Sequence, residues 1–185
     1  DLARQRQLTV HGARTVIGPD GRGLNRVTAV GPRGQILAEY DKIHPFCLGA
    51  PSEAERFTAG SRVITYPWTS PDGRGSASVC PAICYDLRFP ELFRAGMLAG
   101  AEVFAIGSNW PVTREFHRRT LSIARAIENQ AFVLSVNRVG RDPSLEYGGG
   151  TLAVSLRGEV LGELASGEGV LSVPIDLDDL PRWRA

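Results

Sequence analysis

The sequence predicts an α/β protein in which a mixed sheet, or two sheets, is covered by helices. Two observations carry this prediction. Apolar and β-branched segments separated by turns, such as the one over residues 70–73, indicate hairpins toward both ends of the chain. Between them, apolar strands alternate with helical segments, and one of these segments places Leu121, Ala124 and Ile127 on a single face. Because the sequence has neither repeats nor an internal linker, residues 1–185 are predicted to form one domain.

The first half of the chain is predicted to be mostly β-structure. Strands are expected over 8–17, 24–30 and 35–40 as a meander, and over 62–68 and 77–83 as a further hairpin. The connection over 42–60 has no periodic pattern, and long connections of this kind are often functional. The first seven residues read as the end of a helix already under way, so we expect the start of the natural protein to lie upstream.

The second half is predicted to alternate between helices and strands. Pro90 and Glu91 suit the first turn of a helix, because proline fits the first helical position and an acid complements the positive helix end. The predicted elements are a helix over 91–99, a strand over 102–106, a helix over 114–130, and strands over 132–136, 151–155, 160–164 and 169–175.

Composition narrows the class of protein. The chain has 21 basic and 20 acidic residues, and this balance argues against a nucleic acid or an anionic membrane as partner. No apolar run reaches the length of a membrane span, and the start lacks the apolar core of a signal peptide. An odd set of three cysteines argues against a disulfide framework and fits a reducing compartment, so we expect a cytoplasmic protein.

Cys84 is the leading candidate for chemistry. It ends an apolar strand-like run and is followed by a polar turn and the helix start at Pro90, and α/β proteins place their chemistry at such strand ends. Backbone amides and the helix dipole there would lower the pKa of a thiol and favour a developing oxyanion. The residues alone leave a second reading open, because a free cysteine often serves as a small buried hydrophobe.

Two neighbours in the 42–60 connection bear on the role of Cys84. If Lys42 meets the thiol, its ammonium would stabilise a thiolate and the oxygen of a tetrahedral intermediate. His44 could instead act as the base of a Cys–His pair. A zinc site built on Cys80 and Cys84 is disfavoured, since no second Cys/His pair has ligand spacing, and we expect neither metal nor cofactor.

Several ordered blocks of the sequence resemble the nitrilase, or carbon–nitrogen hydrolase, superfamily. The resemblance runs from about residue 25 to the end of the chain, and blocks in the right order are far more specific than any one of them. The blocks are residues 40–46 (YDKIHPF), Glu53, residues 84–91 (CYDLRFPE), 109–111 (NWP), 125–130 (RAIENQ), 137–140 (NRVG) and the segment around Tyr147.

The resemblance implies a catalytic set of glutamate, lysine and cysteine. By motif, Cys84 resembles the nucleophile, Lys42 the oxyanion-stabilising lysine and Glu53 a second glutamate found in many members. The backbone amide of Tyr85 resembles part of the oxyanion hole. The family's first glutamate, the general base, lies upstream of every residue in this chain, so we expect this polypeptide alone to be nearly inactive.

The resemblance also places Arg88, Trp110 and Glu128 at the border of the substrate pocket. Arg88 could pair with a substrate carboxylate or form a structural salt bridge with Glu91 or Asp86. The motif pattern is most similar to bacterial omega-amidase-like members, which act on small omega-amides of 2-oxo acids. An N-carbamoyl amino acid amidohydrolase and a nitrilase remain alternatives.

The fold that the resemblance implies is a four-layer α/β/β/α sandwich, here expected to lack its first strand and helix and to form a homodimer or a higher homo-oligomer. A second hypothesis from a different class is a binding or interaction protein that kept the fold and lost the base. It predicts ligand binding without turnover. A Cys–His hydrolase would be distinguished by tolerance of a change at Lys42 together with inactivation by His44→Ala.

Overall fold

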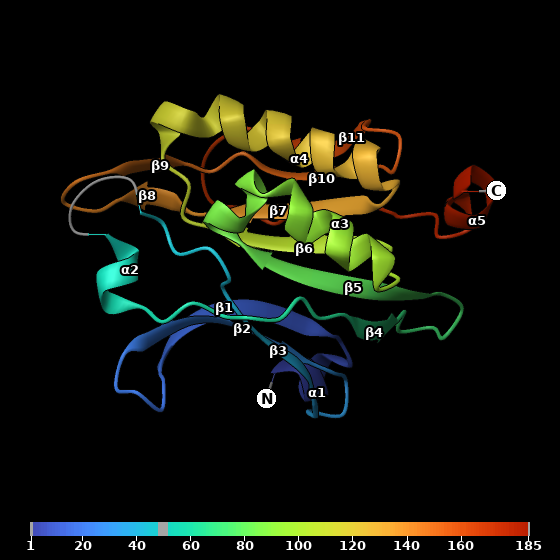
Figure 1. The fold of residues 1–185 in the computed structure, drawn as a ribbon. Coiled ribbons are helices and arrows are strands. Elements are labelled where there is room, and N and C mark those ends of the chain that lie inside the picture. Colours follow the sequence, from blue (N-terminus) through green and yellow to red (C-terminus); the bar gives the residue numbers. More distant parts are fainter. Residues whose placement is uncertain (1, 48–51, 185) are drawn as a thin grey trace.

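A computed structural model describes residues 2–47 and 52–184. Its N-terminal part is a three-stranded antiparallel sheet, shown in blue in Figure 1, that follows the short helix α1 (Leu2–Arg6). The strands are β1 (Val10–Ile17), β2 (Gly23–Val30) and β3 (Ile36–Asp41), and they lie in the order β1-β2-β3. The predicted meander is therefore confirmed, and it leads directly into the 42–60 connection.

A six-stranded sheet forms the centre of the described chain, with the strand order β11-β10-β7-β6-β5-β4. Its middle strands β5, β6 and β7 are parallel, and the outer strands pair antiparallel. Their bounds are β4 (Tyr66–Thr69), β5 (Ser76–Ile83), β6 (Val103–Ser108), β7 (Phe132–Asn137), β10 (Thr151–Val154) and β11 (Val160–Leu164). Because parallel strands end at the same sheet edge, β5, β6 and β7 bring their following loops together.

Helices cover one face of the six-stranded sheet and the three-stranded sheet faces the other (Figure 1). The covering helices are α3 (Pro90–Leu98) and α4 (Glu115–Asn129), which connect the parallel strands. On this side Phe93 of α3 packs edge-on against Phe104 of β6, with ring centroids 5.0 Å apart. On the other side Val27 and Tyr40 of the small sheet belong to the same core. Burial of such side chains contributes about 1.5–3 kcal/mol each.

The helix α4 differs from its predicted face. Ile127 is 53% exposed, whereas Arg118 and Arg125 are buried. Arg118 donates to the Oγ of Ser135, and Arg125 donates to the backbone oxygen of Leu87. Hydrogen bonds compensate these buried guanidinium groups, so the face of α4 that meets the sheet is more polar than its apolar spacing predicts.

Other differences concern short elements. The strand predicted over 169–175 does not form: Val170 is 92% exposed, and Pro174 has no N–H to donate to a sheet ladder. Elements that the sequence did not predict are α2 (Glu53–Arg56), α5 (Asp179–Arg184), the 3-10 turns η1 (Cys84–Arg88) and η2 (Val112–Arg114), and the hairpin β8 (Val139–Arg141) and β9 (Glu146–Gly148). In the part of the chain that the structure describes, no helix is long and apolar enough to cross a membrane.

Candidate active site

Cys84 lies directly after β5, at the first position of η1. Its backbone has a φ of 48°, in the left-handed region that few residues other than glycine adopt, and this turn reverses the chain at the strand end. The thiol sulfur is 3.9 Å from the backbone oxygen of Asn109, which follows β6. The strand end predicted for Cys84 is confirmed, and the thiol faces the loop of the neighbouring strand.

Lys42 and Glu53 form an ion pair within the 42–60 connection. The Lys42 Nζ donates to Glu53 Oε2 at 2.5 Å, and the lysine is only 3% exposed. The same carboxylate oxygen accepts from the backbone N–H of Phe46 at 2.7 Å. Ser52 caps α2 by accepting from the Ala54 N–H, so the helix starts where Glu53 can reach back to the lysine. The structure thus pairs two residues that the family resemblance assigns to one catalytic set, a contact that the sequence did not predict.

Asp86 ties this connection to the turn after Cys84. Its side chain is completely buried and accepts from the hydroxyl of Tyr40 at 2.7 Å and from the backbone N–H of Ile83 at 2.9 Å. It also accepts from the backbone N–H of His44 and contacts the Nδ1 of that residue at 2.8 Å. His44 is stacked on Phe89 and is not among the described residues that line the cavity of Cys84, and the thiol contacts Asn109 instead, so the position of His44 does not support the alternative of a Cys–His pair.

The electrostatics of Cys84 differ from the sequence prediction. Burial raises the pKa of the Cys84 thiol, and Glu53 and Asp86 raise it further, while the ammonium of Lys42 opposes them. The net direction is upward, because removal of a thiolate from water outweighs the nearby positive charge. The helix start therefore does not leave a resting thiolate here, and reaction of the thiol requires a group that accepts its proton.

The Cys84 thiol faces a cavity of about 820 Å³. Of the residues predicted to act there, the cavity is lined by Cys84, Lys42, Glu53, Tyr85, Arg88 and Trp110. The Trp110 backbone N–H donates to Asn137 Oδ1 at 2.8 Å, so the ends of β6 and β7 are held together under the cavity. The Arg88 guanidinium lies 5.1 Å from the Trp110 ring centroid and has no ion pair with Glu91 or Asp86 among the described residues.

Glu128, the remaining predicted pocket residue, has a different place. It does not line the cavity and pairs with Arg125 at 2.9 Å. Arg125 in turn donates two hydrogen bonds to the backbone oxygen of Leu87, within η1. The prediction that Glu128 borders the substrate pocket is therefore corrected: this residue lies behind the turn that carries Cys84.

Several other residues that line the cavity have no role predicted from the sequence, namely Phe46, Arg114, Asn137, Arg138 and Tyr147. The place of Asn137 at the cavity could have been inferred from the parallel topology, since this residue ends β7 beside the ends of β5 and β6. Arg114 lies at the end of η2, a turn too short to have a periodic signal.

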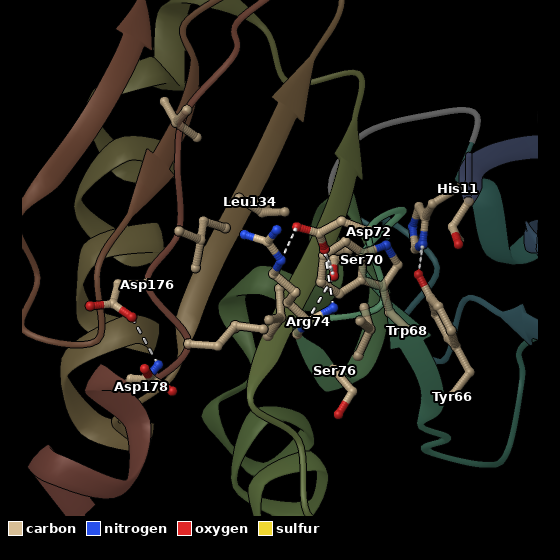
Figure 2. A pocket seen from close by; sticks show the side chains of 18 residues that line it. His11, Tyr66, Trp68, Ser70, Asp72, Arg74, Ser76, Leu134, Asp176 and Asp178 are labelled. Atoms are coloured by element: carbon tan, nitrogen blue, oxygen red, sulfur yellow. Dashed lines mark hydrogen bonds and ion pairs between the residues drawn. The ribbon is translucent and has the colours of Figure 1, made fainter. Parts of the chain in front are cut away.

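A second cavity, of about 750 Å³, opens between β1 and the six-stranded sheet (Figure 2). His11 and Tyr66 point toward each other there, with His11 Nδ1 2.9 Å from the Tyr66 hydroxyl. Burial lowers the pKa of His11 to about 4, so its imidazole is neutral near pH 7. Neither cysteine nor lysine is among the described residues that line this cavity, so the predicted chemical groups gather in the first one. Within residues 2–47 and 52–184, no cluster of three or more His, Cys, Asp or Glu side chains is arranged to hold a metal ion.

The two-sheet α/β architecture, with a thiol and a lysine–glutamate pair beside the parallel strand ends, defines a protein of the nitrilase fold class. Comparison with known families agrees. The chain belongs to the carbon–nitrogen hydrolase family, whose sequence pattern matches residues 2–185.

Individual relatives add detail. The 2-oxoglutaramate amidase of Bacillus subtilis (strain 168) is 40% identical over 146 residues, which are 79% of this chain and 53% of the relative. XC1258 from Xanthomonas campestris, solved with an arsenic adduct in the active site, has a TM-score of 0.87 and 31% identity over 98% of this chain and 68% of that one.

A mutant amidase from Nesterenkonia sp. AN1, solved with the acetamide moiety of fluoroacetamide added covalently at the active site cysteine, has a TM-score of 0.78. It is 26% identical and covers 91% of this chain, which spans 61% of that one. The chain spans between about half and two thirds of the length of the first curated relatives it matches.

Proposed function

We propose that this protein is an amidase that hydrolyses a small amide through a thioester on Cys84. The observation that carries the proposal is the shared cavity of the Cys84 thiol and the buried Lys42–Glu53 pair. Attack of a thiolate on an amide carbon leaves negative charge on the carbonyl oxygen, which a nearby cation stabilises, and Lys42 is a buried ammonium that lines the same cavity as the thiol. The covalent adduct on the active site cysteine of the Nesterenkonia amidase supports the same role for Cys84.

The proposed reaction has two halves. In the first, the thiol loses its proton, the sulfur bonds to the amide carbon, and the carbonyl oxygen becomes an oxyanion that faces Lys42 and the Tyr85 N–H. Collapse of this intermediate breaks the C–N bond, and the amine leaves with a proton. In the second half, water attacks the thioester, the C–S bond breaks, the carboxylic acid is released and the thiol is regenerated.

The proton transfers of this reaction require a base close to the thiol. Glu53 is the one carboxylate among the described residues that line the cavity, and Lys42 and Phe46 already occupy one of its oxygens. We therefore propose that Glu53 orients the lysine and that full activity needs a further carboxylate beside the sulfur. Positioned proton transfer contributes about 10²–10⁴-fold, so the chain 1–185 alone is expected to turn over slowly.

The favoured substrate is an omega-amide of a 2-oxo acid. The 2-oxoglutaramate amidase of Bacillus subtilis supports this choice, while N-carbamoyl amino acids and nitriles are the alternatives. We further propose that the protein works in the cytoplasm as a homodimer or a higher homo-oligomer. Three free cysteines fit a reducing compartment.

The experiment combines turnover with detection of the intermediate. Ammonia release is measured with 2-oxoglutaramate, an N-carbamoyl amino acid and a nitrile, and acid-quenched samples are analysed by intact mass. We expect an acyl adduct on the native protein and on Cys47→Ser, which changes an exposed thiol, and none on Cys84→Ala. Substrate binding without adduct or ammonia would instead favour the non-catalytic binding protein.

A further inference from the structure

The catalytic cavity carries an excess of positive charge. Its basic lining residues are Arg14, Lys42, Arg88, Arg114 and Arg138, and its acidic one is Glu53. Three of these cations have carboxylate partners: Lys42 pairs with Glu53 at 2.5 Å, Arg14 with Glu39 at 3.6 Å and Arg138 with Asp142 at 3.8 Å. For Arg88 and Arg114, no carboxylate lies within ion-pair distance in the described part of the chain. Two guanidinium groups thus face the cavity without a counter-ion.

Arg114 lies over the ring of a residue whose backbone contacts Glu53. Its guanidinium lies 5.4 Å from the ring centroid of Phe46, the residue whose N–H donates to Glu53. Its backbone is fixed by the Trp110 indole, which donates to the Arg114 carbonyl at 2.8 Å. Stacking on an aromatic face leaves the N–H edge of a guanidinium available for a planar acceptor.

Arg88 flanks the cavity at a different place. It lies over Trp110, and its Nη2 is 3.1 Å from the Nδ1 of His117, so part of its donor edge is engaged. The Arg114 guanidinium has no hydrogen-bond partner within residues 2–47 and 52–184. Of the two cations without a counter-ion, Arg114 therefore has the freer donor edge.

We infer that Arg114 binds the carboxylate of the substrate and makes this site select amides that carry a carboxylate at the end remote from the scissile bond. The inference rests on the proposed amidase function. A guanidinium can donate two parallel hydrogen bonds to a carboxylate. An amide whose remote end is neutral cannot accept them in the same way. A cavity of about 820 Å³ has room for such a small anionic amide.

The test compares an anionic and a neutral substrate of similar length, succinamate and butyramide. For Arg114→Met we expect the ratio of their kcat/KM values to fall about 10–100-fold, mainly through the KM of succinamate. Arg114→Lys keeps the charge without the fork and should retain an intermediate ratio. The matched control is Arg119→Met on α4, because Arg119 pairs with Glu163 and does not line the cavity. Its ratio should equal that of the native protein.

A second readout does not depend on turnover. In a Cys84→Ala background, calorimetry should give a succinamate Kd that rises about 10–100-fold with Arg114→Met. An equal loss for both amides, or no change for either, would overturn the role of Arg114. If the native protein releases no ammonia while the binding of succinamate still depends on Arg114, the proposed function fails and the carboxylate site stands.

Discussion

A single oxygen of Glu53 accepts both the ammonium of Lys42, at 2.5 Å, and the backbone N–H of Phe46, at 2.7 Å. This geometry fixes the direction of a lysine that is almost completely buried. It also ties Phe46, which lines the cavity, to the first residue of α2, so one carboxylate organises two parts of the site.

Replacement of this carboxylate tests its organising role. Glu53→Gln keeps the shape but leaves the Lys42 ammonium without a counter-ion. We expect the free energy of unfolding to fall by about 1–3 kcal/mol, less than for a fully buried pair because Glu53 is partly open to solvent. Urea denaturation measures the change, and Glu55→Gln, on the exposed side of α2, is the control. Equal stability of both variants would contradict the role of Glu53.

The charge of Lys42 should be visible in the acidity of Cys84. Its ammonium lowers the thiol pKa against the larger effect of burial, so Lys42→Met should raise that pKa further. The pH dependence of alkylation by iodoacetamide gives the pKa, measured in a Cys47→Ser background that removes the exposed thiol. An unchanged pKa would show that the lysine charge does not reach the sulfur.

Asp86 offers a test of the link between the 42–60 connection and the turn after Cys84. It is completely buried and accepts from Tyr40, Ile83 and His44. Asp86→Asn presents an amide nitrogen to one of these donors, and we expect a loss of about 2–4 kcal/mol in stability. Asp72→Asn, in the exposed turn before β5, should stay within about 0.5 kcal/mol. Thermal melts compare the two, and similar losses would argue against the network.

Replacement of Glu128 can distinguish a substrate contact from a structural role of this residue. Because it pairs with Arg125 and does not line the cavity, Glu128→Gln should cost about 0.5–1 kcal/mol of stability and leave KM within about twofold. Steady-state kinetics and urea denaturation of the same sample give both values. A KM that rises tenfold with unchanged stability would restore the substrate contact expected from the motif.

The sequence predicted the parts of the fold that have a strong local pattern. The parallel unit β5-α3-β6-α4-β7 follows from long apolar strands and helices between them, and Cys84 was placed at its strand end. The left-handed backbone of Cys84 was not predictable, since cysteine has no preference for it.

Contacts between distant segments were harder to predict. The short helix α2 was not predicted, although Ser52 followed three residues later by Glu55 is a capping pattern that indicates a helix start. The resemblance to the family places Glu128 at the pocket. However, Glu128 also follows the buried Arg125 by three residues in α4, and this is the spacing at which side chains on a helix form ion pairs. Spacing alone does not say whether such a glutamate faces a ligand or its own helix neighbour.

His11 predicts how stability depends on pH. Burial lowers its pKa from 6.5 to about 4, so between these values the unfolded chain binds more protons than the folded protein. The stability that neutral His11 allows is therefore complete above pH 6.5 and is lost as the pH falls toward 4. By linkage this loss is about 2 kcal/mol at pH 5. Urea denaturation of the native protein at pH 7.5 and 5 should show this loss in the free energy of unfolding. For His11→Gln, the loss between the same two pH values should be smaller by about 2 kcal/mol. The same pH dependence in both would show that His11 is not the group responsible.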